Sequence, residues 1–142
     1  GEVYYNWCAA TATSGTSSIN CNTTTSPNTS ICPKGWTLPT NGDSGVNKSW
    51  ARLFSNIPNV GYNYTAGSQF VNNTNILGFT KYYGLWYWAL ASEGNQGSAG
   101  SFWSGTPSAE TNAYHLRYTS GDVHPQTILD KGFGFSIRCV AR

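Results

Sequence analysis

Four cysteines constrain this chain of 142 residues more than any other feature, because paired cysteines staple distant segments of a fold together. An even cysteine count in a short chain favours a disulfide framework, and disulfides persist in an oxidising compartment. The chain has no CxxC motif, so redox-active cysteines are disfavoured. We therefore predict structural disulfides, with the pairing left open by the residues alone, among Cys8, Cys21, Cys32 and Cys139.

N-glycosylation sequons point to the same location outside the cytoplasm. None of them has proline in its middle position, and they begin at Asn22, Asn28, Asn47, Asn63 and Asn72. We predict that they carry sugars on polar loops of an extracellular or cell-surface protein. The chain begins at Gly1 and contains no methionine, which predicts a processed or engineered start, most simply one left when a secretory leader is removed.

Composition restricts the function classes further. Charged residues make up 10% of the chain and the net charge is +2, which gives no basis for nucleic-acid binding. Aromatic residues reach 15%, so a packed core is expected beneath the polar surface. No apolar run approaches the roughly 20 residues that a membrane span needs. No lipidation signal or wall-anchoring tail is visible either.

The first half of the chain is predicted to hold one helix among loops. Residues 1–12 contain a β-favouring aromatic run that begins at Val3, and residues 13–30 have the composition of a long polar loop. Proline and glycine exclude a helix from residues 31–40 and favour a short extended stretch. Residues 50–57 have the apolar spacing of a helix, with Ser49 as its cap and Pro58 as its stop.

The second half is predicted to be mostly β. Strands are expected at residues 101–105, 113–119 and 134–141, with a turn at residues 120–122. One early helix followed by several antiparallel strands predicts an α+β fold. The most aromatic segment, residues 81–92, comes before these strands. Some of its rings are expected to fill the core, and others to be exposed to a ligand or partner.

Four segments of the chain resemble one bacterial family. They are YNWCAATATSGT at residues 5–16, SICPKGWTLPT at 30–40, FWSG at 102–105 and GFSIRCV at 134–140. Together they are similar to the Fibrobacter succinogenes major paralogous domain, a family of secreted and surface proteins that resembles the C-type-lectin-like fold. The resemblance implies a single C-type-lectin-like domain over residues 1–142, in which the N- and C-terminal strands pair. It also implies that Cys32 bonds Cys139, which leaves Cys8 to bond Cys21.

No catalytic or metal-binding pattern accompanies this resemblance. The Glu-Pro-Asn, Gln-Pro-Asp and Trp-Asn-Asp tripeptides of calcium-dependent lectins do not occur, and Glu110, Asn112 and Asp122 are too few oxygen ligands for calcium. His115 and His124 lack the spacing of zinc ligands, and no acidic residue lies in a glycosidase motif. We therefore predict a protein that is not an enzyme and that uses no metal or cofactor.

Two functions from different classes remain. The first is a structural or adhesive surface subunit that self-assembles into an extracellular fibre, favoured by the low charge and by β-forming ends that can complete a neighbour's sheet. The alternative is a monomeric lectin-like domain whose aromatic segment and late strands bind a glycan or a protein. The expected partners are thus further copies of the chain, a glycan or a protein. The binding candidates are Tyr82, Tyr83, Trp86, Tyr87, Trp103, Tyr114, His115, Arg117 and Tyr118.

Overall fold

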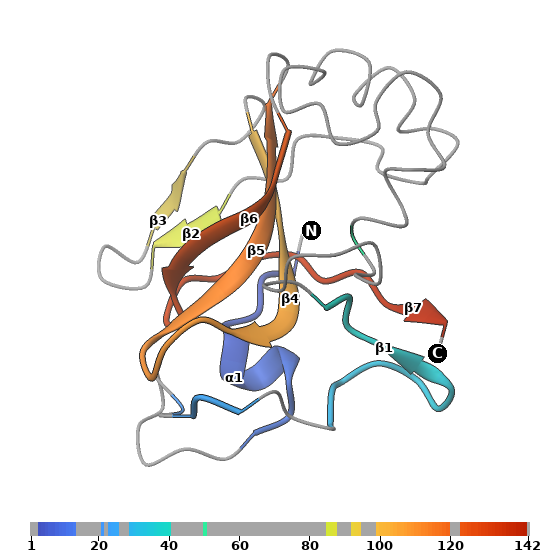
Figure 1. The fold of residues 1–142 in the computed structure, drawn as a ribbon. Coiled ribbons are helices and arrows are strands. Elements are labelled where there is room, and N and C mark those ends of the chain that lie inside the picture. Colours follow the sequence, from blue (N-terminus) through green and yellow to red (C-terminus); the bar gives the residue numbers. More distant parts are fainter. Residues whose placement is uncertain are drawn as a thin grey trace.

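Within the residues that the structure describes, the chain forms antiparallel β-sheets, a short helix and two disulfides, as seen in a computed structural model. The structure describes residues 3–13, 21, 23–25, 29–40, 50, 85–87, 92–94, 99–119 and 123–141, with the backbone alone at 85–87 and 92–94. This architecture is consistent with the predicted α+β class. In chain order the elements are α1 (Trp7–Ala10), β1 (Trp36–Thr37), β2 (Leu85–Tyr87), β3 (Ser92–Gly94), β4 (Ala99–Pro107), β5 (Asn112–Thr119), β6 (Val123–Asp130) and β7 (Val140–Ala141) (Figure 1).

Strands β4, β5 and β6 form the largest sheet, in that order and antiparallel throughout. Trp103 of β4 lies opposite His115 of β5, and Tyr114 of β5 lies opposite Ile128 of β6. Two further sheets have two strands each, β2 with β3 and β1 with β7. The β1–β7 pair lies away from β5 and β6, beside the C-terminal end of the chain (Figure 1).

The N-terminal segment turns helical at Trp7, the last aromatic residue of the β-favouring run that the sequence predicts. Asn6 caps α1, and its Oδ1 accepts a hydrogen bond from the backbone N–H of Ala9 at 2.8 Å. Thr11 closes the other end, with its N–H and its hydroxyl both donating to the carbonyl of Trp7 at 2.9 and 2.8 Å. Trp7 is fully buried, and its Nε1 donates to the carbonyl of Ser104 at 2.8 Å. Caps and tertiary burial thus override the β propensity of this run.

Pairing between the two ends of the chain occurs at one position of the N-terminal run. The N–H of Tyr5 donates to the carbonyl of Phe135 at 2.9 Å, and the N–H of Phe135 donates back at 3.0 Å. The backbone N–H and carbonyl of Tyr5 therefore form their strand-type hydrogen bonds within the same chain. The predicted strand at 134–141 is shorter than expected, because Phe135 and Ser136 bridge different partners, Tyr5 and Phe102, before β7 pairs with β1.

The other late-strand predictions are confirmed and one strand is added. Residues 101–105 and 113–119 lie within β4 and β5. The sequence does not predict β6, because Pro125 and Gln126 interrupt its apolar pattern, and an outer strand of a sheet tolerates proline. The predicted helix at 50–57 lies outside the described residues except for Trp50, which is helical and fully buried. The predicted turn at 120–122 also lies outside them.

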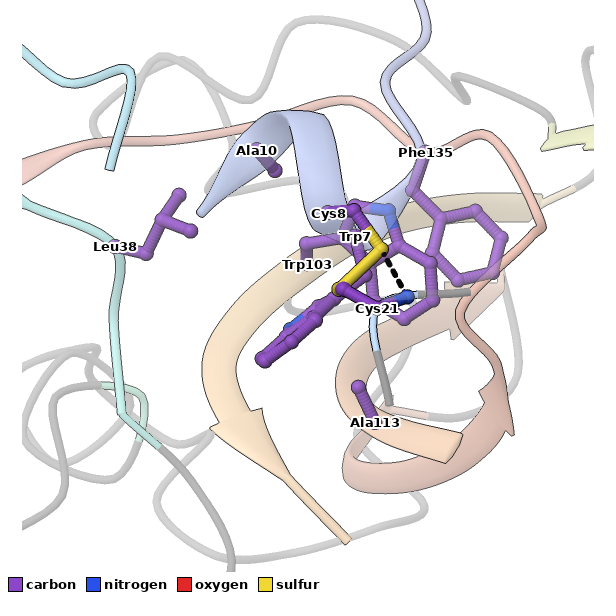
Figure 2. Packing of buried hydrophobic residues seen from close by; sticks show 8 residues of the cluster. All are labelled: Trp7, Cys8, Ala10, Cys21, Leu38, Trp103, Ala113 and Phe135. Atoms are coloured by element: carbon purple, nitrogen blue, oxygen red, sulfur yellow. Dashed lines mark hydrogen bonds between the residues drawn. A yellow bond between two sulfur atoms is a disulfide. The ribbon is translucent and has the colours of Figure 1, made fainter. Parts of the chain in front are cut away.

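Aromatic rings from three distant segments fill the core. Trp7, Trp103 and Phe135 gather against α1 and β4, with the Cys8–Cys21 bond beside them (Figure 2). The ring centroids of Trp103 and Phe135 are 4.3 Å apart. The Nε1 of Trp103 donates to the carbonyl of Tyr5 at 2.8 Å, so the indole both packs and pins the N-terminal segment.

Both disulfide pairings that the family resemblance implies are confirmed. Cys8 bonds Cys21, and Cys32 bonds Cys139 across a sequence separation of 107. The first bond is buried, and the N–H of Cys21 donates to the Sγ of Cys8 at 2.7 Å (Figure 2). In the part of the chain that the structure describes, no helix has the length and apolar character to cross a membrane.

Candidate interaction surface

Three of the predicted binding residues belong to the core instead of the surface. Trp103, His115 and Tyr118 are 0%, 2% and 1% exposed. This burial does not favour the role of ligand contact predicted for them, which stays a prediction. They are buried on both faces of the sheet, since His115 and Tyr118 are three residues apart on β5 and point to opposite sides.

His115 illustrates the difference between a chemical site and a core histidine. Its imidazole lies 5.8 Å from the Trp103 ring and 4.5 Å from the Phe135 ring, and its Nδ1 is buried without a hydrogen-bond partner. Burial, with a smaller contribution from the charge of Arg117, lowers the pKa of His115 to about 3. The ring is therefore neutral at physiological pH and acts as a packing element.

The structure describes the side chains of only some of the other predicted binding residues. Tyr114 and Arg117 are half-buried, and Tyr114 lies opposite Ile128, which is 47% exposed on the outer strand. Trp86 and Tyr87 form part of β2, where the backbone alone is described. Outside the described residues lie two binding candidates and every predicted glycosylation site, namely Tyr82, Tyr83, Asn22, Asn28, Asn47, Asn63 and Asn72.

A surface that sequence reasoning missed is the loop formed by residues 31–36, called here the 31–36 loop. Its sequence is ICPKGW, and its two large apolar side chains are both exposed, Ile31 at 39% and Trp36 at 47%. Pro33 and Lys34 between them are exposed as well. Two exposed apolar side chains therefore flank one turn, which makes this loop a candidate interaction site.

This loop is fixed at several points along its length. The N–H of Ile31 donates to the carbonyl of Ala10 at 3.1 Å, and the N–H of Trp36 donates to the carbonyl of Pro33 at 2.9 Å. Gly35 has a φ of +85°, the left-handed conformation that allows the chain to turn there. The two ends of the 31–36 loop are held by the Cys32–Cys139 disulfide and by the β1–β7 pairing.

Such a loop is suited to binding because its conformation is set in advance. A rigid aromatic anchor loses little conformational entropy on association, and buried tryptophans are over-represented among residues that dominate binding energy. The sequence shows a Pro-Lys-Gly turn between Cys32 and Trp36 but not which way the flanking side chains face.

Comparison with known proteins finds no match for this chain among protein families, curated proteins or solved structures.

Proposed function

We propose that this chain is an extracellular, non-catalytic surface protein with a structural or adhesive role, which associates with further copies of itself through the 31–36 loop. We propose a C-type-lectin-like fold for it on the four segments described above. The observation that carries the function is the exposure of Trp36 at 47% on a loop tied down by a disulfide. Covering a large exposed ring on such a loop with a partner lowers the free energy by removing apolar surface from water.

The charge of the protein supports association between copies. With 10% charged residues and a net charge of +2, identical chains repel one another weakly. Covering Ile31 and Trp36 would bury apolar surface, which is insensitive to the screening of charges by salt. We therefore expect self-association to persist from low to high salt, unlike an interface built on ion pairs.

A second candidate function uses the same ring. A monomeric lectin-like domain would stack the flat indole face of Trp36 on a sugar, and the exposed Lys34 ammonium would donate hydrogen bonds to its hydroxyls. This alternative needs no second copy of the chain. The two functions therefore differ in what covers Trp36.

Light scattering coupled to size-exclusion chromatography, with negative-stain microscopy of the same fractions, tests the proposal. We expect the mean mass to rise with protein concentration and oligomers or filaments to appear on the grid. A monomer at every concentration would overturn self-association. Screening the monomer on a glycan array then tests the second candidate, which requires a glycan that Trp36→Ala no longer binds.

A further inference from the structure

Lys131 lies in the interior although lysine is rarely buried, and it joins three separate segments. The residue follows β6 directly and is 0% exposed. Its backbone N–H donates to the carbonyl of Thr111 at 2.9 Å, and its carbonyl accepts from the N–H of Trp7 at 3.0 Å. The side chain extends from this backbone position toward the segment that contains Cys21.

The ammonium group is surrounded by backbone carbonyls. Its Nζ donates to the carbonyl oxygens of Thr23 at 2.6 Å, Glu110 at 2.7 Å and Cys21 at 3.3 Å. The same atom lies 4.5 Å from the centroid of the Trp7 ring. An ammonium group has three N–H donors, so three carbonyls satisfy it completely, and the indole face adds a cation–π contact.

A convergence of carbonyl oxygens and an aromatic face favours a monovalent cation such as an ammonium group. The three carbonyls come from two segments that are distant in sequence, residues 21–23 and Glu110, and the ammonium group supplies a donor to each oxygen. Burial lowers the pKa of Lys131, while the carboxylates of Glu110 and Asp130 oppose that shift. The three acceptors around Nζ fit the charged ammonium, which has three donors, better than the neutral amine, which has two.

We propose that the carbonyl oxygens of Cys21, Thr23 and Glu110 and the indole of Trp7 form a monovalent-cation site that the chain occupies with its own Lys131 ammonium. The site takes small primary ammonium ions when Lys131 no longer reaches it. Its role is to hold the segment of the Cys8–Cys21 disulfide, the turn between β4 and β5, and α1 together by one charge. This inference is independent of the function proposed for the 31–36 loop.

Chemical rescue of Lys131→Ala tests the site, with Lys131→Met as the matched control. The alanine variant removes the whole side-chain stem and its charge, whereas methionine fills most of the same space without a charge. We expect both variants to unfold at a lower temperature than the wild type. Propylammonium chloride should then raise the Tm of Lys131→Ala by about 4 °C at a tenfold excess over its Kd, measured against sodium chloride of equal ionic strength.

The control decides the outcome. Lys131→Met and the wild type should show no saturable rise with propylammonium, because the site is filled in both. An equal response of the alanine and methionine variants, or no response of the alanine variant, would overturn the proposal. If Lys131→Ala does not fold alone, the proposal requires propylammonium to restore its near-ultraviolet circular dichroism, and failure to do so counts against the site.

A measurement on the wild type avoids dependence on the variants. Ammonium protons held by three acceptors and shielded from water exchange slowly, so a ¹H–¹⁵N correlation spectrum should contain one protected lysine Nζ resonance at neutral pH. That resonance should be missing from Lys131→Met. A wild-type spectrum without it would show that the ammonium is not held as proposed.

Discussion

The imidazole of His115 and the phenyl ring of Phe135 pack against each other in the core, with 4.5 Å between their centroids. His115 comes from the central strand of the largest sheet, and Phe135 from the segment that also pairs with Tyr5. A titratable ring therefore sits where the two ends of the chain meet. Protonating it would place a charge among aromatic rings, beside the charge of Arg117.

Acid is predicted to destabilise the protein through His115. The folded-state pKa of about 3 lies below the ordinary value of 6.5, so the unfolded chain binds the proton more readily between these two values. The stability that neutral His115 gives the fold is fully present above pH 6.5. As the pH falls toward 3, the free energy of unfolding loses about 4–5 kcal/mol in total from this residue. Urea unfolding measured across this interval should show the decline.

Two variants isolate the cause of that pH dependence. His115→Phe keeps a ring at this position but cannot be protonated, so its stability should vary less with pH than that of the wild type. His124→Gln removes the other histidine, which is only half-buried, and is the matched control for the loss of a histidine. A His115→Phe profile as steep as the wild type would assign the acid sensitivity to other groups.

Substitution of Gly100 by a larger residue is predicted to destabilise the protein. The Tyr118 ring lies against its backbone, and a β-carbon at this position would overlap the ring. Gly100→Ala should therefore lower the free energy of unfolding by about 1–3 kcal/mol. Gly105→Ala is the matched control on the same strand, because its β-carbon would meet Leu38 at an ordinary 3.4 Å. Equal losses in chemical denaturation would contradict this reading of the contact.

The two disulfides are predicted to differ in their rate of reduction. Cys8 and Cys21 are buried in the core, whereas Cys32 and Cys139 are half-buried beside the 31–36 loop. A thiolate must reach a sulfur atom to attack it, so limiting reductant should open Cys32–Cys139 first. Alkylation of the partly reduced protein followed by peptide mapping measures the order. Earlier labelling of Cys8 and Cys21 would show that the core opens more readily than the loop.

Truncation of the N-terminus is predicted to lower the free energy of unfolding sharply once Tyr5 is removed. Removing residues 1–5 deletes the pairing of Tyr5 with Phe135 and leaves the buried Nε1 of Trp103 without its acceptor. We expect a loss of at least about 2 kcal/mol in the free energy of unfolding. Removing residues 1–3 ends at Val3, whose side chain is 61% exposed, and should cost little. Similar stability of the two truncated proteins would contradict the role given to Tyr5.

The sequence predicts the parts of the fold that depend on local pattern or on resemblance. The α+β class and strands β4 and β5 follow from composition and periodicity, and the disulfide pairing follows from the family-like segments. The helix at Trp7 does not, because it forms where an Asn6 cap and burial against Ser104 outweigh a β-favouring run. Local propensity carries no information on that burial.

The candidate sites are harder to predict for a related reason. The partners of Lys131 are backbone carbonyls, which any residue type supplies, so no motif marks them. The exposure of Trp36 depends on which way the Pro-Lys-Gly turn faces, and that is decided by the distant bonds of Cys32 to Cys139 and of Ile31 to Ala10. Aromatic density in the sequence instead favours residues such as Trp103, which the fold buries.

Sedimentation velocity over a concentration series tests self-association through the 31–36 loop most directly. The samples are the wild type, the double variant Ile31→Ser/Trp36→Ser, and Ile128→Ser, which removes an equally exposed apolar side chain from the outer strand of the sheet. We predict that the wild type and Ile128→Ser shift to larger sedimentation coefficients as concentration rises, while the double variant remains a monomer with an unchanged Tm. Association of the double variant at wild-type concentrations would contradict the assignment of this loop as the contact between copies.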